Sequence, residues 1–212
     1  MKKIIIILLI ILNILLIIPT KAKEKKLILN DKIIIIDPGH GGKDIGTSYS
    51  SINEKDINLS ISKYLAYYLE EYGATVHLTR ESDYDLSTPN TNRRKRSDFD
   101  NRIKLINDYK PDLVISIHQN YYKDSKYNGT QIFYKENKVL AEYLQENINP
   151  NRNTKPISNT LYMYSKLNSD VLLIECGFLS NSKDRKNLTD NKYQQDYSKK
   201  IAKYISEYYK NN

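Results

Sequence analysis

Three short, almost wholly apolar runs in this 212-residue chain are each followed closely by a side chain that can bind a metal ion. The runs are residues 33–36, 113–117 and 171–174, and the side chains that follow them are His40, His118 and Glu175. Runs of this length and composition are typical of strands covered on both faces, as in a parallel sheet. Since parallel strands end at one edge of a sheet, where open α/β folds bind ligands, we expect the two imidazoles and the carboxylate to meet there.

Strand-like and helix-like patterns alternate along most of the chain. Strands are expected at residues 32–37, 74–80, 113–118, 129–134, 161–164 and 171–175, and helices at residues 54–72, 98–109, 137–147 and 193–209. The main loops between them are expected at residues 38–50, 81–97 and 148–159. This alternation predicts an α/β fold with a single domain, a largely parallel or mixed central sheet, and helices on both faces.

The first 22 residues differ from the rest of the chain. Lys2 and Lys3 precede an apolar stretch, residues 4–18, which is followed by the small residues Thr20 and Ala22. A basic start, an apolar middle and small residues at the end are typical of an export signal. The apolar stretch is long for a signal peptide and slightly short for a membrane span.

We therefore expect residues 1–22 to be a signal peptide, with an uncleaved signal anchor as the less favoured alternative. Membrane contact would then occur only through residues 4–18, if they are not removed. Residues 23–31 are expected to be a linker and residues 32–212 to be the folded domain. Because the basic end of such a segment stays inside the cell, that domain is expected to be exported across the cytoplasmic membrane.

The charge of the chain indicates which classes of partner it could bind. A formal net charge of +8 draws a protein toward anionic polymers, or reflects only a solvated lysine-rich surface. The densest basic cluster, residues 93–96, has no interleaved aromatic residues and no DNA- or RNA-binding motif beside it. Nucleic acid is therefore not expected as a partner.

Two further residues have structural interpretations. Cys176 is the only cysteine, which excludes an internal disulfide. It adjoins Glu175 at the end of an apolar strand, so a small buried hydrophobe is favoured over a nucleophile. His77 lies in the middle of an expected strand with no other polar residue converging on it, so it is interpreted as structural or as a surface residue.

His40, His118 and the carboxylates of Glu54 and Glu175 form a candidate zinc site. Zinc in hydrolases is typically held by three protein ligands with water in the fourth position, and two histidines with one glutamate is a known set. One carboxylate would bind the metal, and the other would act as general base toward a water molecule whose pKa the metal lowers to about 7. The residues alone leave open which carboxylate has which role.

Each candidate also has a structural alternative. Residues 51–54 have the pattern of a capping box, in which Glu54 would only bond back to the Ser51 amide. His40 lies among glycines and could be a turn residue, and the spacing of those glycines matches neither common phosphate-binding loop. Asp37 and Asn120 could be hydrogen-bond partners of the two histidines or ordinary turn residues.

Four motifs occur in a fixed order. They are residues 37–42 (DPGHGG), 54–59 (EKDINL), 116–120 (SIHQN) and 174–181 (IECGFLSN). Together they closely resemble the zinc-dependent N-acetylmuramoyl-L-alanine amidases of the amidase-3 family, over roughly residues 32–209. The resemblance implies that His40, Glu54 and His118 bind one zinc ion per chain and that Glu175 is the catalytic glutamate. It also implies that residues 32–212 are a zinc amidase catalytic domain.

The stretch from Thr79 to Arg102, and the cysteine after Glu175, are most similar to the germination-specific, spore-cortex branch of that family. This implies an enzyme of the cell wall or spore intermembrane space, secreted or membrane-anchored. It would strip stem peptides from peptidoglycan so that a partner deacetylase can form muramic-δ-lactam during sporulation. An accessory or activator protein could be needed. Some family members carry a long helix that plugs the site, and the 25 residues from Glu136 to Thr160 leave little room for one, which predicts an open groove.

Two other functions are compatible with the residues. Glu54 and Glu175 could be the acid and base of a metal-free wall glycosidase, which would release reducing sugar ends rather than new amino termini. The chain could also be a non-catalytic, basic wall-binding protein, which would bind without turnover.

Overall fold

The central sheet is mixed. In the computed structural model, which describes residues 27–212, a sheet of six strands has the order β4-β1-β5-β8-β6-β7. Its strands are β1 (Ile33–Pro38), β4 (Thr75–Leu78), β5 (Leu113–Asn120), β6 (Gln131–Tyr134), β7 (Lys155–Pro156) and β8 (Asp170–Phe178). β1 pairs in parallel with β4 and β5, and β5 pairs in parallel with β8, whereas β6 runs antiparallel to β8. The largely parallel or mixed sheet expected from the sequence is confirmed.

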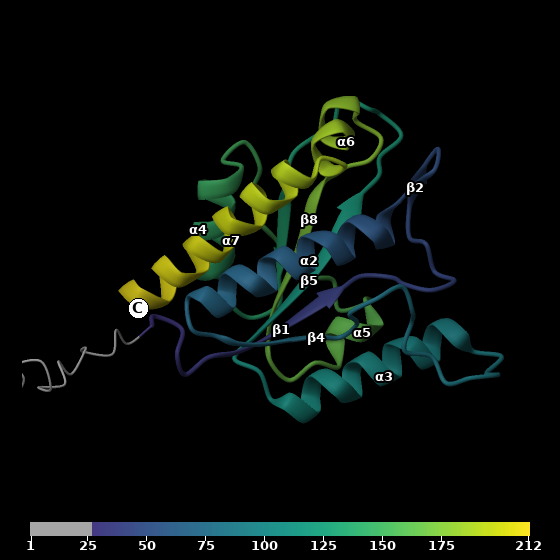
Figure 1. The fold of residues 1–212 in the computed structure, drawn as a ribbon, viewed down its shortest axis with the longest axis horizontal. Coiled ribbons are helices and arrows are strands. Elements are labelled where there is room, and N and C mark those ends of the chain that lie inside the picture. The colour runs from purple at the N-terminus through teal and green to yellow at the C-terminus, as the bar shows by residue number, and fades with distance from the viewer. Residues whose placement is uncertain (1–26) are drawn as a thin grey trace, which may run out of the picture.

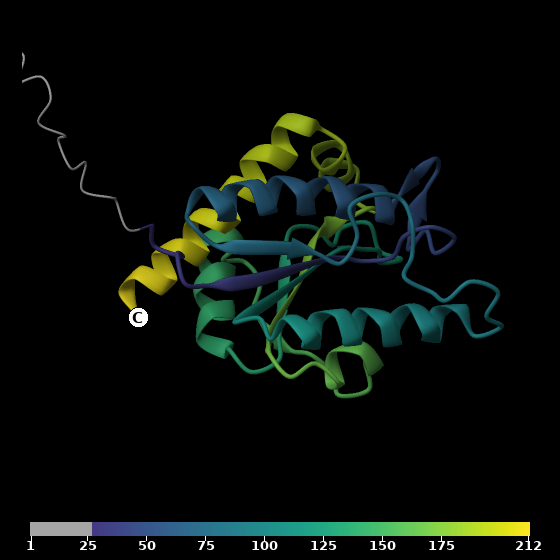
Figure 2. The same ribbon diagram turned by 60° about the horizontal axis from the view of Figure 1, so that its bottom comes forward.

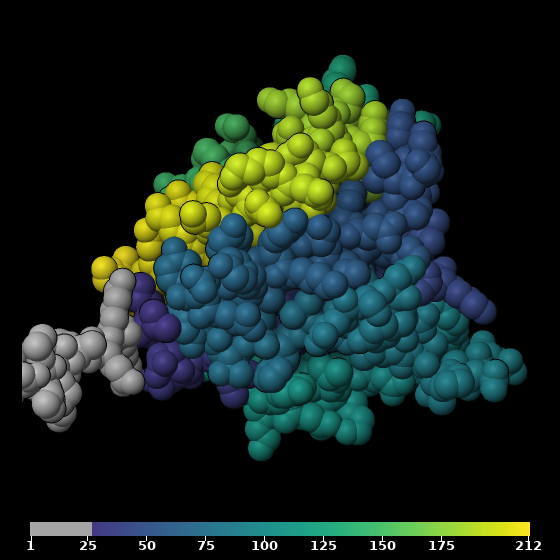
Figure 3. All heavy atoms as spheres, in the orientation of Figure 1, coloured from purple at the N-terminus to yellow at the C-terminus, as the bar shows by residue number. Residues whose placement is uncertain are grey.

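Helices cover both faces of this sheet. They are α2 (Glu54–Glu71), α3 (Arg94–Tyr109), α4 (Lys138–Ile148), α5 (Tyr162–Ser165), α6 (Ser182–Leu188) and α7 (Asn191–Asn211). α2 and α7 lie side by side over one face, and α4 packs against α7 (Figure 1, Figure 3). α3 and α5 lie on the opposite face (Figure 2). The expected single α/β domain with helices on both faces is confirmed.

The apolar runs are continuous because each central strand lies between two helical layers. Along β1, Ile34 and Ile36 belong to the core under α2 and α7, whereas Ile35 packs with Ile106 of α3 and Met163 of α5. Ile34, Ile35 and Ile36 are all fully buried. Burying such a side chain contributes about 1.5–3 kcal/mol, so both faces of these strands favour apolar residues.

Some local predictions were wrong. Residues 161–164, expected as a strand, contribute to the short helix α5. A run of four apolar residues fits either structure, and here Met163 and Tyr164 are buried on the α3 face of the sheet. α3 begins at Arg94, inside the expected loop 81–97. Helix α6 and the two-stranded hairpin of β2 (Ser48–Tyr49) and β3 (Ile52–Asn53) were not predicted.

The expected signal segment, residues 1–22, lies outside the described residues, as does the first part of the expected linker, residues 23–31. Among residues 27–212, no helix has the length and apolar character needed to cross a membrane. Leu29 is fully buried in the main core, and its backbone N–H donates to the Tyr72 carbonyl at 2.9 Å. The packed part of the described chain therefore includes Leu29.

Candidate metal centre

The ends of β1, β5 and β8 bring the predicted residues to one edge of the sheet. β5 and β8 are in parallel register with His118 beside Glu175. The backbone N–H of Gly39, which follows β1, donates to the Ile117 carbonyl at 3.0 Å, so the chain turns toward His40 next to the end of β5. The convergence expected from the three apolar runs is present.

Three of the four side chains form a compact donor cluster. One ligand atom from each of His40, Glu54 and His118 can be chosen so that all lie within 4.8 Å of one another. Glu54 Oε1 is 2.9 Å from His118 Nδ1 and 3.3 Å from His40 Nε2. Two imidazole nitrogens and one carboxylate oxygen match the donor types of hydrolytic zinc sites, so these residues fit a zinc ion.

Glu54 does not form a capping box. It is the first residue of α2, and the helix N-cap is Asn53 rather than Ser51. Its Oε2 accepts from the Thr47 backbone N–H at 2.8 Å, and its Oε1 accepts from the Gln119 backbone N–H at 3.0 Å. Burial alone would raise the pKa of Glu54, but His118 and His40 outweigh burial and lower it, so the carboxylate stays ionised between the two rings.

His40 lies in a strained turn, with φ of 62°. Its Nδ1 lies 3.1 Å from Asp44 Oδ1, on the other side of the ring from Glu54. Burial lowers the pKa of His40, but Asp44 and Glu54 together overcome that effect and raise it to about 9. Asp44 was not singled out from the sequence, and a carboxylate four residues after a histidine was the available signal.

Glu175 stands apart from this cluster as an unpaired carboxyl group. Its Oε2 atom is buried and has no hydrogen-bond partner among the described residues. Burial raises the pKa of Glu175 to about 7, partly opposed by the nearby His118 and reinforced by Glu54. A carboxyl group with this pKa can both accept and donate a proton near neutral pH.

Gly39 provides the space for the His118 ring. A Cβ atom at position 39 would lie 2.2 Å from the His118 ring carbon Cε1. Any side chain there would displace the imidazole. The glycine in the motif at residues 37–42 therefore has a steric role in the site.

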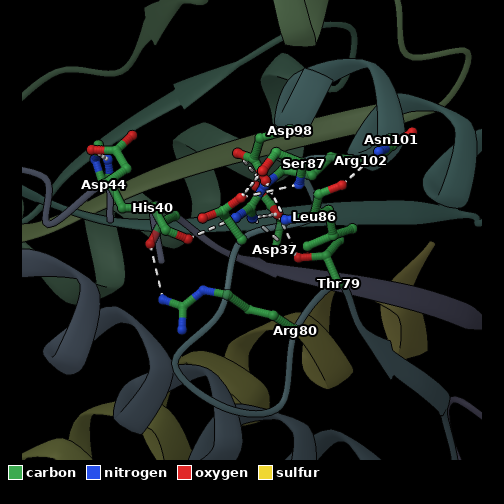
Figure 4. Close-up of polar contacts among 12 residues, drawn as sticks. Asp37, His40, Asp44, Thr79, Arg80, Leu86, Ser87, Asp98, Asn101 and Arg102 are labelled. Atoms are coloured by element: carbon green, nitrogen blue, oxygen red, sulfur yellow. Dashed lines mark hydrogen bonds and ion pairs between the residues drawn. The ribbon is translucent and has the colours of Figure 1, made fainter. Parts of the chain in front are cut away.

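Two buried arginines hold the backbone around His40 (Figure 4). Arg102 on α3 donates to the His40 carbonyl and to Asp37 Oδ1, both at 2.6 Å, and to Asp98 at 3.1 Å. Arg80, which follows β4, donates to the Pro38 and Gly39 carbonyls, both at 3.0 Å. The carbonyl groups of three consecutive residues are thus fixed by two guanidinium groups.

The sequence did not indicate this role for the two arginines. Their partners around His40 are distant in the sequence, and several are backbone atoms. Of the two alternatives for Asp37, a hydrogen bond to His40 is not formed: Asp37 contacts Arg102, Thr79 and Ser116 instead. The Asn120 side chain accepts from the neighbouring Tyr121 backbone N–H rather than bonding to His118.

A cleft of about 240 Å³ borders two members of the cluster, His40 and His118. Its lining combines the polar groups of His40, His118 and Glu175 with apolar residues that include Phe99 and Met163. No residue of α4, the helix between Glu136 and Thr160, lines this cleft. The open groove stays a prediction.

The remaining singled-out residues are not members of the donor cluster. The His77 ring stacks on Tyr109 with 4.2 Å between centroids. Cys176 is buried, and burial raises the pKa of its thiol to about 12, as expected of a structural residue. In the basic cluster, Arg94 pairs with Asp85 and Arg96 pairs with Asp100.

Comparisons with known proteins identify the family of this chain. Residues 34–207 match the family model described as N-acetylmuramoyl-L-alanine amidase, Amidase_3. The chain is 39% identical to the germination-specific N-acetylmuramoyl-L-alanine amidase of Bacillus subtilis, over 88% of this chain and 84% of that protein. It is 31% identical to the probable cell wall amidase LytH of Staphylococcus saprophyticus, over 85% of this chain and 60% of that longer protein.

Solved structures give the same result. The CwlD amidase from Clostridioides difficile, in complex with the GerS lipoprotein, superposes with a TM-score of 0.81 and 37% identity, covering 86% of this chain and 100% of that chain. The amidase AmiC2 of Nostoc punctiforme superposes with a TM-score of 0.70 and 28% identity, covering 84% of this chain and 96% of that chain. The family resemblance seen in the four sequence motifs is confirmed.

Proposed function

Because this chain belongs to the N-acetylmuramoyl-L-alanine amidase family, Amidase_3, we propose that it hydrolyses peptidoglycan by a zinc-dependent mechanism. The bond cleaved is the amide between the lactyl group of N-acetylmuramic acid and the L-alanine of the stem peptide. The observation that carries the zinc assignment is the cluster of His40, Glu54 and His118 beside the unpaired carboxyl group of Glu175.

His40, Glu54 and His118 would hold one zinc ion per chain, through two ring nitrogens and one carboxylate oxygen. Zinc bound there would polarise the scissile carbonyl group and acidify the attacking water molecule. Glu54 is suited to the ligand role rather than to proton transfer, because it lies between two imidazoles that keep it ionised. Asp44, 3.1 Å from His40 Nδ1, would pair with that imidazole electrostatically.

Glu175 is the proton carrier of this proposal. It takes a proton from the attacking water molecule and passes it to the nitrogen of the departing L-alanine as the C–N bond breaks. The products are a free lactyl carboxylate on the sugar and a stem peptide with a free amino terminus. A pKa of about 7, caused by burial, suits a group that must accept and then release one proton.

The relatives support a role in the spore. One is named for germination, and the solved structure at 37% identity is of an amidase in complex with a lipoprotein. We propose that this chain acts in cortex maturation, upstream of muramic-δ-lactam formation, and that an accessory protein assists it. Export would depend on residues 1–22, as a signal peptide or signal anchor, with residues 23–31 as a linker to the catalytic domain, residues 32–212.

The other two functions have less support. A metal-free glycosidase would need Glu54 as a free acid or base, whereas Glu54 contacts both imidazoles and two backbone amides. A purely wall-binding protein would not need a carboxyl oxygen buried without a partner on Glu175, beside His118. Neither alternative explains the arrangement as fully as the amidase does.

Zinc stoichiometry tests the ligand assignment. We expect the purified protein to hold about one zinc ion per chain and His40→Ala and His118→Ala each to hold far less, because either change removes one of three protein ligands. His77→Ala is the matched control, since that histidine stacks on Tyr109 outside the cluster. Elemental analysis after dialysis measures the zinc content, and full occupancy in both ligand variants would refute the assignment.

A further inference from the structure

We propose that Tyr164 is a positioning residue for His118, whose Nε2 proton it accepts so that Nδ1 is left free to bind the metal. This inference rests on the proposed zinc function of the cluster. Tyr164 lies on α5, on the opposite side of the His118 ring from Glu54. No sequence motif indicated this role for Tyr164, and its segment was expected to be a strand.

A chain of hydrogen bonds runs from Asp37 to His118. Asp37 Oδ2 is 3.0 Å from Ser116 Oγ, and Ser116 Oγ is 3.1 Å from the Tyr164 hydroxyl. The Tyr164 hydroxyl is 3.4 Å from His118 Nε2, at the long end of the hydrogen-bonding range. Asp37, Ser116 and Tyr164 are all buried, so most of this chain lies inside the fold.

The direction of this chain follows from which groups can donate. Asp37 forms a 2.6 Å ion pair with Arg102, and an ionised carboxylate only accepts hydrogen bonds. Ser116 must therefore donate its proton to Asp37, which leaves its oxygen to accept from the Tyr164 hydroxyl. The Tyr164 oxygen is then the acceptor, and His118 Nε2 is the donor.

This direction matters for metal binding. The other ring nitrogen, Nδ1, faces Glu54 Oε1 at 2.9 Å and is the atom on the metal side of the ring. A metal ligand must offer a lone pair, so the proton of a neutral imidazole must be on Nε2. Partners that hold such a proton orient the ring and raise metal affinity, and their loss typically weakens binding by about 10–100-fold.

The same support reaches both histidine ligands. Arg102 pairs with Asp37, where the chain to His118 begins, and also donates to the His40 carbonyl at 2.6 Å. Figure 4 shows Arg102, Asp37 and His40 together at this point. One buried guanidinium group thus anchors the surroundings of both imidazoles.

Tyr164→Phe tests the inference, because it removes only the hydroxyl group. We expect its zinc dissociation constant to rise about tenfold, the lower end of the range, since the N···O distance is long. Tyr162→Phe is the matched control: that tyrosine lies on the same short helix, but its hydroxyl bonds to the exposed Asp100. Competition with a chromophoric chelator measures zinc affinity, and circular dichroism confirms that both variants fold. Unchanged affinity in folded Tyr164→Phe would overturn the inference.

NMR of the wild-type, zinc-loaded protein gives a test that needs no variant. We expect the His118 ring proton to be on Nε2, because the Tyr164 hydroxyl oxygen accepts it there. A proton on Nδ1 would overturn the inference. Failure of the proposed zinc function can be told apart from failure of this inference. If the wild-type protein binds no zinc, the proposed function is refuted before Tyr164→Phe or the His118 proton is examined.

Discussion

At the scale of single residues, the account depends most on Glu175. Glu175→Gln keeps the size of the side chain but cannot carry a proton, so we expect activity on peptidoglycan to fall by at least about 10²–10⁴-fold. Zinc content should be unchanged, because Glu175 is not among the proposed ligands. Glu142→Gln, on the exposed side of α4, is the matched control and should retain activity. Release of stem peptides measures the effect, and near-normal turnover would remove Glu175 from the mechanism.

The raised pKa of Glu175 also predicts how stability depends on pH. The carboxyl group titrates near 4.5 in the unfolded chain and near 7 in the fold, where burial favours its neutral form. Its contribution to the free energy of unfolding is therefore complete below about pH 4.5 and is lost as the pH rises to about 7. Because glutamine does not titrate, the free energy of unfolding of Glu175→Gln does not fall in this way as the pH rises.

We expect metal-free Glu175→Gln to gain stability relative to the metal-free wild type across that interval. The gain is at most about 3 kcal/mol, since one pKa unit corresponds to about 1.4 kcal/mol. Urea unfolding of both chelated proteins at about pH 4.5, 6 and 7.5 measures the difference. A difference that does not change with pH would contradict the assigned environment of Glu175.

The four site residues could be selected from the sequence because they stand at the ends of apolar runs or in short motifs. Glu54 remained ambiguous until the fold showed its carboxylate between two imidazoles rather than at Ser51. Arg80, Arg102 and Tyr164 could not be selected. Their roles depend on contacts between segments far apart in the sequence, and no local pattern records such contacts.

At the scale of elements, helix α3 holds the end of β1 through Arg102. That guanidinium is buried between Asp37 and Asp98 and also bonds to backbone carbonyls. We expect Arg102→Met to destabilise the fold by about 3–5 kcal/mol, because it leaves two buried carboxylates without their partner. Lys104→Met, which breaks an exposed ion pair with Asp108 on the same helix, should change stability by less than about 1 kcal/mol. Urea unfolding compares the stability of the two variants. Similar losses of stability in both would contradict the role of Arg102 in holding the end of β1.

Element prediction succeeded where one physical signal dominated. The buried faces of α2 and α7 follow helical spacing, and β1, β5 and β8 are apolar on both faces. It failed at residues 161–164, because four apolar residues do not distinguish a short helix from a strand. It also failed at the start of α3, where charged residues facing solvent carry no apolar periodicity.

At the scale of the whole molecule, function follows from strand direction. β1, β5 and β8 are neighbours and parallel, so His40, His118 and Glu175 meet at one edge of the sheet. In the sequence, His40 and His118 are 78 positions apart, and His118 and Glu175 are 57 positions apart. The class of fold and this meeting point could be predicted from the alternation of elements. The antiparallel pairing of β6 with β8 could not be predicted, since it depends on which strand of the sheet has an unpaired edge.

The central claim is that this chain cleaves the lactyl–L-alanine amide of peptidoglycan with the help of zinc. Mass spectrometry of purified peptidoglycan after incubation with the protein, with chelator and after zinc is restored, tests it most directly. The account predicts free stem peptides that begin at L-alanine, lost on chelation and regained with zinc. Intact lactyl–L-alanine linkages in the presence of zinc-loaded protein, or new reducing sugar ends instead of new amino termini, would contradict it.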